Sequence, residues 1–246
     1  MTQSYSIPEN MRVYAIGDIH GRADLLDHMH ELIAIDMVRN PVDMPVVVYL
    51  GDYIDRGRES SRTLDILVER SCLSDNVERH FLMGNHEYSI LNFIENPLSA
   101  QDWLHWGGVQ TLESYGIEVN PKQFSSGYLV QLGKRLRNAM PENHIDFLNT
   151  LSLKKELGGY LFVHAGVHPD KNLENQSRED LLMIREPFLS SEKPLPKCIV
   201  HGHTISAQPV VRPFRIGIDT GAYDSGVLSC AVLEASDVRF LQTTPE

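Results

Sequence analysis

The sequence predicts an α/β fold whose N-terminal half is built from parallel βα units. Three short apolar runs, 12–16, 46–50 and 77–83, each end in a turn that combines glycine with polar side chains. The order of strand, polar turn and helical pattern is typical of a parallel sheet, in which ligands gather beyond the carboxyl ends of the strands. From residue 152 onward the pattern changes to short β-prone runs.

Helical periodicity follows the first two strands. Apolar residues recur at helical spacing through 24–38, which predicts a largely buried amphipathic helix. The second helical pattern, 60–69, places Leu64, Leu67 and Val68 on one face. Both helices are therefore expected to pack on the sheet that the strands form.

The stretch 95–150 is expected to be a helical insertion in the same domain. Its first part is broken at Gly107-Gly108 and contains Trp103 and Trp106, which would serve either as core residues or as a lid. A second helix is expected at 141–151. The insertion would either cap the site or form a satellite layer without a role in binding.

The C-terminal part predicts mainly strands. The runs 152–157 and 160–163 flank the Gly158-Gly159 turn of a hairpin. A short helix is expected at 177–185. Further strands are expected at 199–200, 216–218, 227–233 and 238–241. Because no repeat, low-complexity segment or linker interrupts the chain, residues 1–246 are expected to form one domain.

Composition limits the classes of partner. The chain has 22 basic and 33 acidic residues and a formal charge of −11, which argues against nucleic acid or an anionic membrane as partner. A phosphorylated substrate is compatible with this negative net charge, because metal cations bound at the site would dominate the electrostatic field there. The three cysteines form no CxxC motif, and no apolar run could span a bilayer. We therefore expect a cytoplasmic protein; the sequence leaves the oligomeric state open.

Five motifs carry the chemistry. Each combines carboxylate, amide or imidazole groups with glycine, and they are Gly17-Asp18-Ile19-His20-Gly21, Gly51-Asp52-Tyr53-Ile54-Asp55-Arg56-Gly57, Gly84-Asn85-His86-Glu87, His164-Ala165-Gly166 and Gly202-His203-Thr204. Asp18 and His20, two residues apart in an extended segment, point to the same side. Asp52 could bridge two cations through its two oxygens, and the second cation would be completed by Asn85, His164 and His203. Such mixed oxygen and nitrogen donors suit Mn, Fe or Zn, and paired ions of this kind clamp the oxygens of an in-line displacement.

In their order, these motifs resemble those of the metallophosphoesterase superfamily, and most closely its bacterial and phage-type serine/threonine protein phosphatase branch. The resemblance implies a β-sandwich of two mixed sheets flanked by helices, the calcineurin-like metallophosphoesterase fold. It also implies two divalent metal ions, with Mn expected and Fe or Zn as alternatives. Asp18, His20 and Asp52 would hold the first ion, and Asp52, Asn85, His164 and His203 the second.

The resemblance also implies roles at the substrate. His86 would be the general acid that protonates the leaving alkoxide, and Asp55 would orient it. Arg56 and Arg185 would bind the phosphoryl oxygens together with Asn85 and His86. The implied reaction is hydrolysis of a phosphate monoester in a protein or a small molecule, by direct attack of a hydroxide that bridges the two metals.

Two alternatives stay open on sequence alone. Met83 stands where protein phosphatases commonly carry arginine, and a dinucleoside polyphosphate (diadenosine tetraphosphate) hydrolase is the second hypothesis. Asp55 and Glu87 fit the phosphatase pattern better. A non-catalytic phospho-binding module is the third hypothesis, and the intact set of motifs argues against it.

Overall fold

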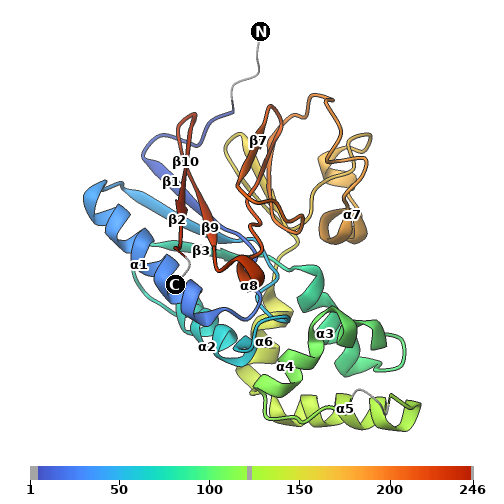
Figure 1. Cartoon of the computed structure of the whole chain (residues 1–246). Coiled ribbons are helices and arrows are strands. Elements are labelled where there is room, and N and C mark those ends of the chain that lie inside the picture. The colour runs from blue at the N-terminus through green and yellow to red at the C-terminus, as the bar shows by residue number, and fades with distance from the viewer. Residues whose placement is uncertain (1–4, 121–123, 245–246) are drawn as a thin grey trace.

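Two five-stranded mixed β-sheets pack face to face and are flanked by helices (Figure 1). The computed structural model describes residues 5–120 and 124–244. The strand order is β10-β9-β1-β2-β3 in the first sheet and β4-β5-β6-β8-β7 in the second. The predicted fold class is thereby confirmed.

The first sheet combines the three predicted N-terminal strands with the last two strands of the chain. Its members are β1 (Met11–Ile16), β2 (Met44–Tyr49), β3 (Glu78–Phe81), β9 (Ser229–Glu234) and β10 (Asp237–Gln242). β1, β2 and β3 run parallel, as the βα pattern predicts, whereas β9 pairs antiparallel with β1 and β10. This places the turns that follow β1, β2 and β3 at one edge of the sheet.

The second sheet contains the predicted hairpin and a further strand that the pattern did not indicate. Its members are β4 (Lys154–Leu157), β5 (Tyr160–Val163), β6 (Cys198–His201), β7 (Val210–Arg212) and β8 (Arg215–Gly217). β4 and β5 pair antiparallel across Gly158-Gly159, while β5, β6 and β8 are parallel. The three-residue β7 is too short to give a period-2 signal in the sequence.

The helices fall into three groups (Figure 1). α1 (Ala23–Arg39) and α2 (Ser60–Ser71) follow β1 and β2 and lie on the outer side of the first sheet. A helical layer lies beyond the strand ends and comprises α3 (Asn85–Glu95), the 3₁₀ helix η1 (Gln101–Trp106), α4 (Gly108–Ser114), α5 (Ser126–Ala139) and α6 (Glu142–Thr150). The second sheet is flanked by the 3₁₀ turn η2 (Leu173–Asn175) and by α7 (Arg178–Met183), and the one-turn α8 (Ala222–Ser225) lies at the sheet ends.

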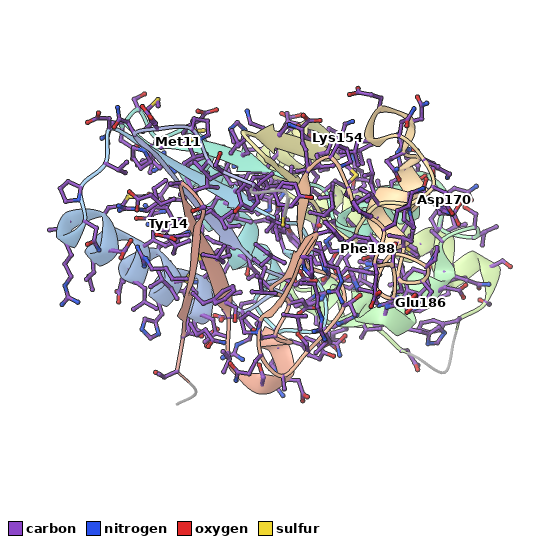
Figure 2. The ribbon with its side chains drawn as sticks, turned by 90° about the horizontal axis from the view of Figure 1, so that it is seen from above. Met11, Tyr14, Lys154, Asp170, Glu186 and Phe188 are labelled. Carbon is purple, nitrogen blue, oxygen red and sulfur yellow. The ribbon has the colours of Figure 1, made fainter. Side chains whose placement is uncertain are left out.

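The described part of 95–150 is helical, and residues 121–123 lie outside the described ranges. That this segment acts as a cap stays a prediction. Figure 2, viewed from above, shows Met11 and Tyr14 on the side of the first sheet, and Lys154, Asp170, Glu186 and Phe188 on the side of the second. No helix in the described ranges combines the length and apolar character needed to cross a membrane.

Period-2 alternation along β1 and β2 divides the core into two layers. Tyr14 and Ile16 join the cluster under α1 and α2, while Val13 and Ala15 join the cluster between the sheets. Successive side chains of a strand point to opposite faces, so a strand covered on both sides must be apolar throughout. The polar residues that follow such strands therefore mark the point where the chain leaves the core.

Candidate active site

The predicted metal ligands converge where the carboxyl ends of strands from both sheets meet. Asp18 follows β1 and Asp52 follows β2, while His164 follows β5 and His203 follows β6. All six predicted ligands, including His20 and Asn85, have exposed fractions of 8% or less. The structure thus brings together every residue for which a metal-binding role is predicted.

The backbone at this site adopts an unusual conformation. Seven non-glycine residues of the described ranges have positive φ, and five of them are predicted site residues with φ between 48° and 73°: His20, Asp52, Asp55, Arg56 and His203. A non-glycine residue in such a region costs about 1–3 kcal/mol and persists only where its surroundings impose it. This clustering shows that the turns are held in place to aim particular side chains.

Glu87 is one of the groups that impose these turns. Its fully buried carboxylate accepts hydrogen bonds from the backbone N–H groups of Asp52 (2.8 Å), Tyr53 (2.8 Å) and Gly84 (2.9 Å). Burial, reinforced by the charge of Asp52, raises the pKa of Glu87 to about 8. Glu87 therefore acts as the cap of the turn that carries Asp52.

Two imidazoles are held in the tautomer that suits a metal ligand. The Nδ1 of His20 donates to the carbonyl of Ile54 (2.8 Å), and the Nδ1 of His164 donates to the carbonyl of Leu50 (2.9 Å). These bonds assign the tautomers and leave the Nε2 lone pairs facing inward. The Nε2 of His164 then lies 2.9 Å from Asn85 Oδ1 and 3.4 Å from Asp52 Oδ1. These nitrogen and oxygen lone pairs face one another with no hydrogen between them, which is unfavourable unless a cation binds among them.

A further buried atom points to the same conclusion. Within the described ranges, Asp18 Oδ1 has no hydrogen-bond partner, and Nδ1 of His203 lies 3.2 Å from His164 Nε2. The other oxygen of Asp18 accepts from the backbone N–H of His203 (2.9 Å), which fixes the carboxylate. A Cβ at position 202 would lie 1.9 Å from Asp18 Oδ1, so this position requires Gly202. Because buried acceptors are normally satisfied, the donor set fits divalent cations.

Two groups of side chains could each hold an ion, and they share Asp52. One is His20, Asp52 and His86, and the other is Asp52, His164 and His203; in each group the ligand atoms lie within 4.8 Å of one another. Burial lowers the pKa values of His20 and His203 to about 3, which keeps the imidazoles neutral, as metal binding requires. Burial would raise the pKa of Asp52, but His164, His86 and His20 hold it below its ordinary value.

His86 differs from the other imidazoles of the site. Its Nδ1 donates to Asp55 Oδ2 over 2.6 Å, and Asp55 also accepts from Trp103 Nε1 (2.7 Å) and Thr111 Oγ1 (2.5 Å). Although burial lowers the pKa of His86, the charge of Asp52 and the hydrogen bond to Asp55 raise it to about 9. The Nε2 of His86 lies 3.4 Å from Arg56 Nη2. Because a guanidinium N–H can only donate, Nε2 of His86 is the acceptor in this contact, and it also lies 3.8 Å from Asp52 Oδ2.

The two predicted phosphate-binding arginines lie at the same site. The guanidinium carbon of Arg56 is 4.8 Å from the ring centroid of Tyr223, and Nη2 of Arg185 donates to the carbonyl of His203 (3.4 Å). His201, by contrast, is buried in β6 and directs Nδ1 to the carbonyl of Gly202 and Nε2 toward Arg215. Of these two histidines, His203 therefore faces the site, with Nδ1 3.2 Å from His164 Nε2.

Sequence reasoning assigned no role at the site to Thr111, Tyr223 or Asp219, and it did not foresee the contact of Trp103 with Asp55. Trp103 and Thr111 bind Asp55, Tyr223 lies against Arg56, and Asp219 lies beside Asp18, where burial and neighbouring Asp52 raise its pKa to about 6. Thr111 belongs to none of the five motifs, so the sequence offers no signal for it. Of the two roles expected for Trp103, the structure shows that of a core residue, because its ring is 1% exposed and its N–H is bound to Asp55. Trp106, 43% exposed, is available for contact with a ligand.

The chain is similar to known proteins in sequence and in fold. A family model described as "Calcineurin-like phosphoesterase" matches residues 11–227. The chain is 27% identical to serine/threonine-protein phosphatase 2 of Salmonella typhimurium, over 88% of this chain and 90% of that one. It is 36% identical to the symmetrical bis(5'-nucleosyl)-tetraphosphatase of Buchnera aphidicola subsp. Baizongia pistaciae, over 91% and 95%. The crystal structure of a cold-active protein-tyrosine phosphatase from a psychrophilic Shewanella species has a similar fold, with a TM-score of 0.55 and 16% identity over 98% of this chain and 83% of that one.

Proposed function

The chain belongs to the calcineurin-like phosphoesterase family, and we propose that it hydrolyses phosphate monoesters on serine, threonine or tyrosine side chains of proteins. Family members use a dinuclear metal site, and the candidate ligand groups on either side of Asp52 fit one. Asp18, His20 and Asp52 would hold one ion, and Asp52, Asn85, His164 and His203 the other. When bound, the two ions supply a nucleophile at neutral pH by lowering the pKa of water, and they neutralise charge on the phosphoryl group.

The observation that carries the proposal is the His86–Asp55 pair. A serine or threonine alkoxide is a poor leaving group and must be protonated as it departs. His86 keeps its Nδ1 on Asp55 and presents Nε2 next to Arg56, at the point where an anionic group would be received. The leaving phosphate of a polyphosphate departs as a stable anion and has much less need of an acid. The pair therefore supports an ester substrate over an anhydride.

The arginines support the binding of a phosphoryl group. Arg56 and Arg185 approach the candidate ligands from different elements, one in the turn after β2 and the other after α7. A guanidinium offers planar N–H donors that match phosphoryl oxygens. We infer that Arg56 binds the phosphoryl group beside His86, and that Arg185 binds it beside His203.

A panel of substrates tests this function. The purified enzyme with Mn is given phosphoserine, phosphothreonine and phosphotyrosine peptides, p-nitrophenyl phosphate and diadenosine tetraphosphate. We expect kcat/KM to be higher for the phosphopeptides than for the dinucleotide. Turnover of the dinucleotide alone would replace the proposal with the second candidate, and cleavage of none of these compounds would contradict both.

The second candidate, hydrolysis of dinucleoside polyphosphates, has one structural observation in its favour. A cavity of about 650 Å³ begins at Asn85 and is lined by Tyr88, Trp106 and Met183 among others. It is large enough for a nucleoside, and stacking on an aromatic ring is worth about 1–3 kcal/mol per base. The charged residues of its lining are Asp102, Glu179 and Arg178, so the two acidic groups are offset in part by one cation and disfavour a polyphosphate only weakly.

Trp106 separates the two candidates. In a nucleotide hydrolase, Trp106→Ala would lower kcat/KM for diadenosine tetraphosphate about 5- to 150-fold, by the stacking energy above, while Trp106→Phe would keep most of it. In a protein phosphatase, neither change alters the ranking of substrates, and phosphopeptides stay the better ones. The comparison is made within one preparation of each variant, with p-nitrophenyl phosphate as the internal reference.

A further inference from the structure

Arg56 is held without a carboxylate partner. Among the described residues, no aspartate or glutamate forms an ion pair with its guanidinium; the contacts that the structure records are His86 Nε2 at 3.4 Å and the ring of Tyr223. A carboxylate would bind the planar fork of N–H groups and cancel its charge. A partner of another kind is therefore needed if Arg56 is to stay in place and still bind an anion.

Tyr223 is a partner of that kind. The guanidinium carbon of Arg56 lies 4.8 Å from the centroid of the Tyr223 ring, and the edge of the His20 ring meets the same tyrosine at a centroid distance of 5.4 Å. An arginine that stacks on an aromatic face is attracted by the ring, while its N–H groups, which lie in the guanidinium plane, stay available. The ring thus stabilises the position of the cation without using its donors.

Local hydrogen bonds hold the segment that carries Tyr223. The short helix α8 is bounded by Gly221 and Gly226, both with left-handed φ, at 65° and 70°. Thr220 Oγ1 donates to the carbonyl of Val227 (2.7 Å), and Ser225 Oγ donates to that of Thr220 (2.7 Å). These bonds close the backbone of the segment on itself around Tyr223.

A bond from the first motif joins this segment to the site. Arg22 Nη1 donates to the carbonyl of Ala222 (3.1 Å), directly before Tyr223. Arg22 follows Gly21, in the turn that also carries His20. The turn after β1 and the segment after β8 are therefore joined by this hydrogen bond and by the contact between the His20 and Tyr223 rings.

We propose that Tyr223 is a positioning residue for phosphate binding, which holds the guanidinium of Arg56 face-on so that its N–H fork is free for the phosphoryl oxygens. This inference rests on the proposed function, in which Arg56 binds the phosphoryl group. In this role the aromatic face of Tyr223 holds the guanidinium of Arg56, and the tyrosine hydroxyl is not needed for it. The ligand is a phosphoryl or orthophosphate anion, whatever the leaving group.

The test measures the inhibition constant of orthophosphate together with KM and kcat for p-nitrophenyl phosphate. Loss of a cation–π contact at Tyr223→Leu should raise the orthophosphate Ki and the KM about 2- to 30-fold, while kcat changes less. Tyr223→Phe, which keeps the ring, should retain the wild-type constants. In an Arg56→Ala background, Tyr223→Leu should add no further loss, because the group that it positions is gone.

Three results would overturn the proposal: an unchanged Ki in Tyr223→Leu, an equal loss in Tyr223→Phe and Tyr223→Leu, or additive losses with Arg56→Ala. Metal content is measured in each variant, because Tyr223 also touches His20; loss of metal in Tyr223→Leu would assign the effect to His20 instead. Tyr128→Leu, at a half-buried position on α5, is the matched control and should leave Ki unchanged. Failure of the function is distinguishable: phosphopeptides would not be cleaved, yet the Ki would still respond to Tyr223.

Discussion

At the scale of single residues, the proposed chemistry depends on how His86 is held. Its Nδ1 is bound to Asp55, and Asp55 is fixed from two other sides by Trp103 and Thr111. Because these buried donors fix the direction of the Asp55 carboxylate, the imidazole has one orientation. A general acid must hold its proton at a fixed point, and this network provides that.

Replacing His86 tests its role directly. His86→Asn should lower kcat for a phosphoserine peptide about 10²- to 10⁴-fold, the usual contribution of a general acid. The loss should be smaller for p-nitrophenyl phosphate, whose phenolate leaves more easily. Steady-state kinetics on both substrates checks this, with metal content from elemental analysis as the control. A variant that loses one metal ion would show that His86 is a ligand in the group with His20 and Asp52.

The pH dependence tests Asp55. The pKa of His86 is raised to about 9, so its acid form is present below that pH and is lost as the pH rises through it. Cations bound at Asp52 would offset the contribution of that carboxylate, which leaves Asp55 as the group that sustains the raised pKa. Asp55→Asn removes this charge, and the alkaline decline of kcat/KM for a phosphoserine peptide should shift to lower pH. An alkaline limb at the same pH in both enzymes would show that Asp55 does not act through His86.

At the scale of elements, the junction between η1 and α4 positions the turn that carries Arg56. Gly107 has a φ of 116°, and its carbonyl accepts from the backbone N–H of Arg56 (3.3 Å). A Cβ at this position would lie 2.5 Å from the backbone nitrogen of Arg56. The helical layer is thus in direct contact with the turn after β2, through a position that only glycine satisfies.

Gly107→Ala should therefore affect both stability and phosphate binding. We expect a loss of about 1–2 kcal/mol from the left-handed backbone alone, and a higher orthophosphate Ki because Arg56 is displaced. Gly116→Ala is the matched control: its φ is also positive, at 73°, but nothing lies within 4 Å of the added Cβ. Thermal denaturation should show destabilisation of both variants, whereas only Gly107→Ala should weaken phosphate binding. Equal Ki values in the two variants would contradict this role of the junction.

The elements also show what the sequence can predict. Strands β1 and β2 are covered on both faces, so they read as apolar runs, and the polar turns after them stand out. Strand β7 spans three residues and was not indicated, and α5 was expected only as part of the helical insertion 95–150. A three-residue strand is too short to repeat its period, whereas the length of α5, 14 residues, does not explain why it was not singled out.

The site could be predicted only in part, because some of its contacts join segments that are far apart in the sequence. Asp18, Asp52 and Asn85 follow strands and belong to motifs, so their proximity is foreseeable from the sheet. Thr111 and Trp103 reach Asp55 from the helical layer, and Tyr223 reaches Arg56 from the segment after β8. Their contacts depend on tertiary packing between distant segments, for which neither spacing nor periodicity gives a signal.

At the scale of the whole molecule, the site joins the two sheets. His164 Nδ1 donates to Leu50 across the sheets, and the backbone N–H of His203 donates to Asp18. The candidate ligands come from both sheets, and they include the buried Asp18 Oδ1, which has no hydrogen-bond partner among the described residues. Metal binding should therefore stabilise the packing of one sheet on the other.

Thermal unfolding measures this coupling. At a free Mn concentration about 100 times the dissociation constant, binding adds about 2.7 kcal/mol, which corresponds to a rise in Tm of about 5–10 °C for a chain of this size. His86→Asn should keep the rise, because it leaves the proposed ligands intact, whereas Asp52→Asn should lose most of it. A rise of the same size in Asp52→Asn would show that the metal binds elsewhere.

The central claim is that two metal ions, held around Asp52, are required to hydrolyse a phosphate monoester. The most direct measurement is a titration of chelated, metal-free enzyme with Mn, in which hydrolysis of a phosphopeptide and bound metal are followed together. We predict no hydrolysis in the metal-free enzyme, and full activity at two ions per chain. Full activity in a preparation shown by elemental analysis to be free of metal would contradict the claim.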